Sequence, residues 1–163
     1  MAQSRETVSA RSAKPSTHGE VPGAPGVVDE RGMRTYGEAL GAALRAPALV
    51  ALRGPLGAGK TTLAQAIARG AGVRGEVTSP TFSLVHQYVT RSGLVYHVDL
   101  FRLENEEELT NLDWDGIVSS DAIVLVEWPE RAGARLPVPR LDIVLSEQTG
   151  RDDVRVVSAE WTL

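Results

Sequence analysis

Apolar positions recur at helical spacing near the start of the chain. The apolar stripe consists of Met33, Tyr36, Leu40 and Leu44. Intervals of three and four residues place such side chains on one face of an α-helix. Thr35 is the expected N-cap, with Glu38 as its capping-box partner. Pro47 bounds the helix, which therefore falls within residues 27–46.

A strand, a turn and a second helix follow. Residues 48–53 (ALVALR) form an apolar run that predicts a short buried strand. Residues 54–61 are rich in glycine and predict a turn. Residues 61–71 (TTLAQAIARGA) predict a helix that stops at Gly70 or Gly72.

Beyond Pro80 the pattern changes to a period of two, which is typical of strands. Apolar and polar side chains alternate over residues 82–89, and residues 91–93 (RSG) mark a turn. Residues 94–100 (LVYHVDL) then predict a second strand. Because the connection is short, the two strands are expected to form an antiparallel hairpin.

The rest of the chain adds a helix and three strands. Residues 104–112 (ENEEELTNL) predict a short acidic helix, and residues 122–128 (AIVLVEW) predict a buried strand. Residues 141–145 and 154–161 flank a turn at 149–150 and predict a final hairpin. Together these elements indicate an α/β fold: a mixed β-sheet flanked by helices, with antiparallel hairpins.

Composition divides the chain into a tail and one folded domain. Residues 1–26 are rich in Ser, Thr, Gly, Pro and Ala and predict a disordered N-terminal tail, which leaves residues 27–163 as a single domain. No apolar run approaches the roughly 18 to 20 residues of a membrane helix, and the N-terminus does not resemble a signal peptide. A cytoplasmic protein that does not enter a membrane is therefore expected.

Charge and cysteine content exclude several kinds of chemistry. The net charge of −4 argues against a broad electrostatic surface for nucleic acid. The chain has no cysteine, which rules out disulfides, thiolate nucleophiles and iron–sulfur clusters. Its three histidines are too scattered to predict a histidine-based metal site.

The turn after the first predicted strand matches a phosphate-binding loop (P-loop). Residues 54–61 read GPLGAGKT and fit G-x-x-x-x-G-K-[ST] in full, between a strand and a helix as that motif requires. Its glycines let backbone N–H groups point at phosphate oxygens, and the helix N-terminus adds a positive dipole end. Lys60 is expected on the β- and γ-phosphates, and the Thr61 hydroxyl on Mg²⁺.

Two acidic residues end predicted strands that are placed to reach this loop. Glu127 closes the run 122–126, and Asp99 follows the run 94–98. Ligands bind at the carboxyl ends of parallel strands in such sheets, so both acids converge on the loop if their strands run alongside residues 48–53. One would contact Mg²⁺ and the other would orient or deprotonate the attacking water. The pattern leaves open which acid does which.

Three other residues have both a functional and a structural interpretation. Thr81 lies where many P-loop proteins carry a switch that senses the γ-phosphate, but the pattern by itself favours an ordinary start of a strand after Pro80. Trp128 follows Glu127 and would either pack near the nucleotide or fill the interior. His97 has no His or Cys close by and is expected to be a packed strand histidine.

Four segments, in this order, resemble one protein family. They read GPLGAGKTT (54–62), VTSPTFSLVHQY (77–88), YHVDLFRL (96–103) and VEWPER (126–131). Together they resemble the TsaE family, also called YjeE, of small bacterial P-loop ATPases required for N6-threonylcarbamoyladenosine at position 37 of tRNA. The resemblance extends over about residues 33–161 and implies a P-loop NTPase-like fold with ATP and Mg²⁺ as cofactors.

The resemblance also implies individual roles. The nucleotide-binding residues would be Gly54, Pro55, Leu56, Gly57, Ala58, Gly59, Lys60, Thr61, Thr62 and Trp128. The metal-binding residues would be Thr61, Thr81 and Glu127, and the catalytic ones Asp99, Lys60 and Glu127. The family often has Asp in place of Pro55 and Tyr in place of Phe101, and neither change removes a phosphate or metal ligand. TsaD- and TsaB-like proteins would be the partners, through which the chain reaches tRNA indirectly.

Other functions stay open on the sequence alone. A small-molecule kinase usually carries an arginine-bearing lid, whereas residues 75–130 contain only Arg91 and Arg102. A GTPase is disfavoured because the D-x-x-G match at residues 113–116 is followed by no N-K-x-D. A nucleotide-gated binding module with little hydrolysis is the non-enzymatic alternative.

Overall fold

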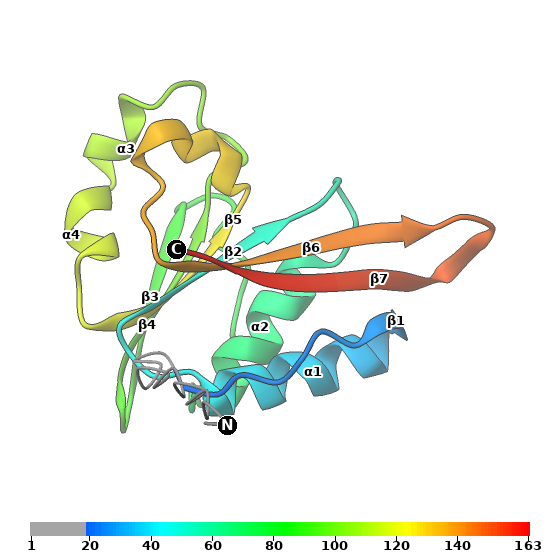
Figure 1. The fold of residues 1–163 in the computed structure, drawn as a ribbon. Helices are drawn as coiled ribbons and strands as arrows, with labels where there is room; N and C mark the ends of the chain where they lie inside the picture. Colours follow the sequence, from blue (N-terminus) through cyan, green and yellow to red (C-terminus); the bar gives the residue numbers. More distant parts are fainter. Residues whose placement is uncertain (1–18) are drawn as a thin grey trace, which may run out of the picture.

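A mixed sheet of seven strands organises the molecule (Figure 1). The computed structural model describes residues 19–163. The strands are β1 (Gly26–Asp29), β2 (Ala48–Arg53), β3 (Val85–Thr90), β4 (Gly93–Asp99), β5 (Ala122–Glu127), β6 (Arg140–Gln148) and β7 (Arg151–Thr162). The helices are α1 (Glu30–Ala43), α2 (Lys60–Gly70), α3 (Glu108–Asn111), α4 (Trp114–Val118) and the 3₁₀ helix η1 (Pro129–Arg135).

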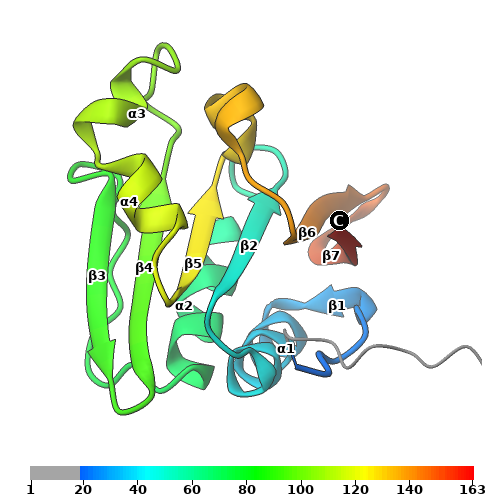
Figure 2. The same ribbon diagram turned by 60° about the vertical axis from the view of Figure 1, so that its left-hand side comes forward.

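The strand order β1-β7-β6-β2-β5-β4-β3 places a parallel group at the centre. Strand β2 runs parallel to both β6 and β5, and β5 runs parallel to β4. The two predicted hairpins, β3–β4 and β6–β7, are antiparallel. The predicted α/β fold with a mixed sheet is therefore confirmed, and the carboxyl ends of β2, β4 and β5 meet at one edge (Figure 2).

Both faces of the sheet are covered, which explains why its central strands read as continuous apolar runs. Helices α1 and α2 cover one face, where Val50 and Leu52 join the larger core cluster. Helices α3 and α4, with η1, cover the other face, where Leu49 and Ala51 join a second cluster (Figure 2). Trp114 fills the second cluster and donates its indole N–H to the carbonyl of Arg135.

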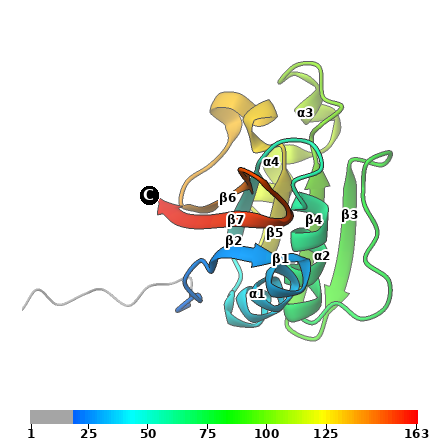
Figure 3. The same ribbon diagram turned by 90° about the vertical axis from the view of Figure 1, so that its right-hand side faces the viewer.

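Strand β1 lies between β7 and α1 (Figure 3) and leads directly into the helix. Helix α1 begins at Glu30 because Asp29 is its N-cap, accepting a hydrogen bond from the N–H of Gly32 at 2.7 Å. The predicted N-cap at Thr35 is thus wrong. Thr35 lies inside the helix, where its hydroxyl donates to the carbonyl of Arg31.

The acidic helix predicted over residues 104–112 is shorter than expected. Asn105 accepts a hydrogen bond from the N–H of Glu108 and donates to its side chain, so that regular helix starts only at Glu108. Of the predicted tail, residues 1–18 lie outside the described part of the chain. Residues 19–25 contain no helix or strand, although Val21 packs against the larger core cluster.

Within residues 19–163, no helix combines the length and the apolar character that crossing a membrane requires.

Candidate functional site

The connection from β2 to α2 is held in shape by its glycines. Gly54, Gly57 and Gly59 all have positive φ angles, of 148°, 79° and 100°. A Cβ on Gly54 would lie 2.5 Å from the carbonyl oxygen of Leu145 in β6, so glycine is needed at this point of contact. The loop therefore curls closely against the sheet before α2 begins at Lys60.

Lys60 lies inside this loop and is only 4% exposed. Its ammonium donates to the carbonyls of Gly54 at 2.7 Å and Pro55 at 2.8 Å, and lies 4.1 Å from the ring centroid of Trp128. Burial lowers the pKa of Lys60, and the carboxylate of Glu127 acts in the opposite direction. A buried cation thus lies where the motif places the phosphate-binding lysine.

Glu127 ends β5 next to β2 and is 2% exposed. Its Oε2 atom accepts a hydrogen bond from the Thr61 hydroxyl at 2.9 Å, and its Oε1 atom lies 2.7 Å from Nε2 of His97. Both carboxylate oxygens are therefore engaged, one by the first turn of α2 and the other by β4.

Asp99 ends β4 directly beside Glu127 in the strand register. Its Oδ1 atom accepts from the N–H of Phe101 at 3.0 Å, and its Oδ2 atom accepts from the Thr81 hydroxyl at 3.4 Å. Burial raises the pKa of Asp99; the hydrogen bond from Phe101 opposes this, and the charge of Glu127 adds to it. The Thr81 hydroxyl also lies 2.6 Å from that of Ser79, which joins the SPTF segment to the site.

A cavity of about 410 Å³ brings most of the predicted site residues together. It is lined by Leu56, Gly57, Gly59, Lys60, Thr61, Thr62, Thr81, Asp99, Phe101, Glu127 and Trp128. The predicted residues Gly54, Pro55 and Ala58 do not line it. Gly54 and Pro55 hold Lys60 through their carbonyls, and Ala58 is buried in the core.

Two residues of the site received no role from the sequence. Phe101 lines the cavity and packs against Trp128, with ring centroids 4.9 Å apart. His97 does not line the cavity but contacts Glu127, which does. The sequence predicted His97 only as a packed strand histidine. Its spacing of two residues from Asp99 is the sequence signal, since alternate residues of a strand share a face.

The donor atoms at this site suit Mg²⁺, which prefers oxygen ligands and usually keeps some from phosphate or water. Thr61, Thr81 and Glu127 present two hydroxyls and a carboxylate on one cavity. Among residues 19–163 no group of three or more His, Cys, Asp or Glu side chains could hold a metal ion. The two hydroxyls and the carboxylate fit a cation that takes its remaining oxygen ligands from phosphate or water.

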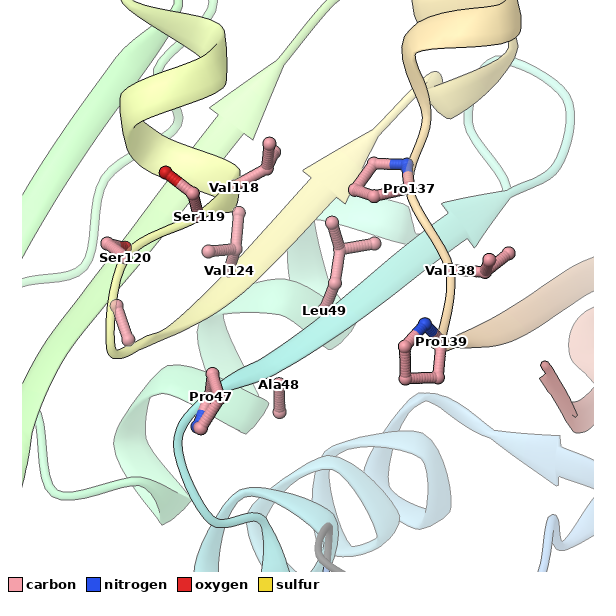
Figure 4. Close-up of a pocket in the computed structure, with 11 residues that line it drawn as sticks. Pro47, Ala48, Leu49, Val118, Ser119, Ser120, Val124, Pro137, Val138 and Pro139 are labelled. Atoms are coloured by element: carbon pink, nitrogen blue, oxygen red, sulfur yellow. The ribbon is translucent and has the colours of Figure 1, made fainter.

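A second cavity, of about 220 Å³, lies at the opposite edge of the sheet, where β2 and β5 begin (Figure 4). Pro47, Leu49, Val124 and Pro139 are among its lining residues, and none of the lining side chains is charged. It therefore offers phosphate nothing comparable with the loop around Lys60.

The fold and the loop together define an α/β nucleotide-binding protein with a P-loop NTPase-like fold. The family model described as threonylcarbamoyl adenosine biosynthesis protein TsaE matches residues 27–156. The chain belongs to the TsaE family, as its motifs predicted.

Several proteins named tRNA threonylcarbamoyladenosine biosynthesis protein TsaE are similar to this chain. That of Streptomyces coelicolor is 42% identical over 131 residues, covering 77% of this chain and 88% of the relative. That of Mycobacterium tuberculosis is 40% identical over 136 residues, covering 78% and 80%. The crystal structure of Bacillus subtilis YdiB matches with a TM-score of 0.64 and 26% identity, covering 83% of this chain and 82% of that one.

Proposed function

We propose that the protein binds ATP with Mg²⁺ in the cavity above the P-loop, hydrolyses it, and thereby supports threonylcarbamoyladenosine formation in tRNA. The observation that carries this proposal is the meeting of Lys60, Asp99 and Glu127 on one cavity of about 410 Å³. A cation, a carboxylate engaged with the P-loop threonine and a second carboxylate are the groups that phosphoryl transfer to water needs.

The P-loop binds the phosphates. Its backbone N–H groups and the N-terminus of α2 face the anion, and Lys60 neutralises charge on the β- and γ-phosphates. Lys60 lines the cavity, and its ammonium is held at the loop by the carbonyls of Gly54 and Pro55. Trp128 and Phe101 line the same cavity and pack against each other, which gives the nucleotide an aromatic surface beside the loop.

Thr61, Glu127 and Thr81 would hold Mg²⁺, which when bound neutralises phosphate charge in the transition state. Support comes from the hydrogen bond that already joins Thr61 to Glu127 at 2.9 Å. Thr81 is carried by the SPTF segment, so this contact would make that segment responsive to the γ-phosphate.

Asp99 is the proposed base for the attacking water. Both oxygens of Glu127 are engaged, whereas Oδ2 of Asp99 has only a 3.4 Å contact from Thr81 among the hydrogen bonds of residues 19–163. The water oxygen bonds to the γ-phosphorus, the bond to the bridging oxygen breaks, and ADP leaves. The proton from the water passes to Asp99.

TsaD- and TsaB-like proteins are the proposed partners, and they make most of the contact with tRNA. The net charge of −4 supports this division, because a chain that binds tRNA by itself is expected to be strongly basic. Hydrolysis by the isolated chain is expected to be slow, with the partners stimulating it.

The test is modification of tRNA in a reaction reconstituted from purified TsaD- and TsaB-like proteins, threonylcarbamoyl donor, tRNA and ATP. Wild-type chain is expected to sustain many rounds of threonylcarbamoyladenosine formation. Asp99→Asn is expected to lower the steady-state yield by about 10²-fold or more, the contribution typical of a positioned base. Equal yields with wild-type chain, with Asp99→Asn and without the chain would contradict the proposal.

A further inference from the structure

His97 is a fully buried polar residue in the strand next to Glu127. It lies on β4, two residues before Asp99, and pairs in register with Leu125 of β5. Its side chain has 0% exposure, and its Nε2 atom is 2.7 Å from Oε1 of Glu127. This is the shortest contact that the site makes to either acidic side chain among the hydrogen bonds of residues 19–163.

Hydrogen-bond chemistry determines the direction of this contact. An ionised carboxylate only accepts hydrogen bonds, so the Nε2–H group of His97 donates the hydrogen bond to Oε1 of Glu127. The other ring nitrogen, Nδ1, is buried and has no hydrogen-bond partner in the described part of the chain. Because an unpaired buried polar atom is unfavourable, packing alone does not account for a histidine at this place.

A glutamate that binds a metal must be prevented from turning, since its terminal torsion is broad and two-fold. Glu127 has one oxygen held by His97 and the other held by Thr61. With Oε1 engaged from β4, only Oε2 faces the P-loop. Mutation of a residue that hydrogen-bonds to a metal ligand typically lowers metal affinity or activity by about 10- to 100-fold.

We infer that His97 is a positioning residue, which fixes the Glu127 carboxylate so that Oε2 alone meets the Mg²⁺ of the bound nucleotide. The inference rests on the proposed function, because it assigns the way in which that site binds its metal. His97 is not among the residues that line the cavity, so it would act only through the hydrogen bond that it donates to Oε1 of Glu127.

Three substitutions of His97 distinguish the effect of its hydrogen-bond donor from the effect of its ring. In His97→Gln the amide N–H lies about as far from the backbone as Nε2, so the hydrogen bond to Glu127 is kept. In His97→Asn the amide lies near the position of Nδ1 and does not reach. His97→Leu places an apolar side chain without a donor at this buried position, and it replaces His97→Asn in the test if His97→Asn fails to fold.

The readout is the Mg²⁺ concentration that gives half-maximal ATP hydrolysis by the complex with TsaD- and TsaB-like partners, at saturating ATP. His97→Asn and His97→Leu are expected to raise this concentration about 10-fold or more. His97→Gln is expected to stay within about 3-fold of wild type, because it restores the bond to Oε1. ATP binding without Mg²⁺, measured with EDTA present, is expected to be unchanged in all three.

Val95→Ala is the control for a purely structural effect. Val95 is buried on the same face of β4, two residues before His97. Its apolar side chain cannot donate a hydrogen bond to Glu127. Its substitution is expected to lower the melting temperature without moving the Mg²⁺ midpoint.

Two results would overturn the positioning role: an unchanged midpoint in His97→Asn and His97→Leu, or a shift in His97→Gln as large as theirs. Failure of the proposed function looks different, since wild-type complex would then show no Mg²⁺-dependent hydrolysis at all.

Discussion

Glu127 and Asp99 lie side by side at the strand ends, yet their oxygens are held differently. Glu127 is bound by Thr61 and His97, at 2.9 Å and 2.7 Å. Asp99 is held by one short bond, from the N–H of Phe101, and one long contact from Thr81. The sequence left open which acid would bind the metal and which would orient water, because it does not show which neighbours each side chain meets in the folded sheet.

Replacement of Lys60 tests the proposed phosphate site. Lys60→Ala is expected to weaken ATP binding by about 10- to 100-fold, since hydrogen bonds to charged groups contribute about 1.5–3 kcal/mol. Equilibrium titration with a fluorescent ATP analogue measures the effect. Arg34→Ala is the control, because it removes a cation of an exposed pair with Glu30. If Lys60→Ala and wild type bind the ATP analogue with equal affinity, the loop around Lys60 is not the phosphate-binding site.

Replacement of Glu127 tests the proposed metal site. Glu127→Ala is expected to raise the Mg²⁺ concentration needed for half-maximal hydrolysis by at least about 10-fold, because a direct or water-mediated carboxylate contact is lost. Glu130→Ala removes a nearby acid that is 46% exposed and pairs with Arg53, and it serves as the control. If Glu127→Ala leaves the Mg²⁺ concentration at half-maximal hydrolysis unchanged, Asp99 and not Glu127 would be assigned as the metal ligand.

Helices and strands with a long hydrophobic pattern were predicted close to their observed bounds, whereas short elements such as β1 and α4 were missed. Strand β2, both hairpins and helix α2 match their predicted segments to within a few residues. Strand β1 has four residues and exists through pairing with β7, which no local pattern reveals. Helix α4 has five residues, too few to be stable alone. It forms because Trp114 is buried against the sheet.

Helices α1 and α2 pack so closely that glycine is required between them. A Cβ at Gly41 would lie 2.0 Å from the carbonyl oxygen of Ile67, a backbone atom that does not move away easily. Gly41→Ala is therefore expected to destabilise the fold by about 1–3 kcal/mol, although alanine favours helix by itself.

Urea unfolding measures this effect, with Gly23→Ala as the control, because a Cβ at Gly23 meets nothing within 4 Å. A Gly41→Ala protein as stable as wild type would mean that the two helices are further apart than the structure places them.

A polar cluster joins β6 to its neighbours and makes stability depend on pH. Asp142 accepts hydrogen bonds from Arg53 of β2, from Arg140 and from Thr162 of β7. Burial raises the pKa of Asp142, but the bonds from Thr162 and Arg53 outweigh it and hold the pKa below the ordinary 3.8. The ionised form thus stabilises the fold above that pH, and its contribution is lost as the pH falls through the lowered value.

Asp142→Asn is accordingly expected to lower the free energy of unfolding at pH 7 by about 1–3 kcal/mol. The difference from wild type should shrink when both are measured at pH 3 and below. Asp153→Asn, at a fully exposed pair with Arg151, is the control and is expected to change little. A deficit of Asp142→Asn that is independent of pH would show that the carboxylate charge is not the cause.

At the scale of the whole molecule, the sheet topology is what turns scattered motifs into one site. Asp99 and Glu127 are separated by 28 positions in the chain, and the parallel register of β4 and β5 makes them neighbours. The position of both acids at strand ends predicted this convergence on the condition that their strands run alongside β2, and the parallel pairs β2–β5 and β5–β4 bring both acids to one cavity. The sequence did not predict the hydrogen bond between His97 and Glu127, because this contact arises only from the register and the buried packing of β4 and β5.

The most direct test of the account is release of inorganic phosphate from ATP by the purified chain, with and without purified TsaD- and TsaB-like proteins. Slow Mg²⁺-dependent release by the chain alone, stimulated by the pair and lost in Lys60→Ala, is the predicted result. Transfer of the phosphoryl group to a small acceptor would identify a kinase instead. Tight ATP binding without phosphate release under either condition would contradict the proposed hydrolysis and leave a nucleotide-gated binding module.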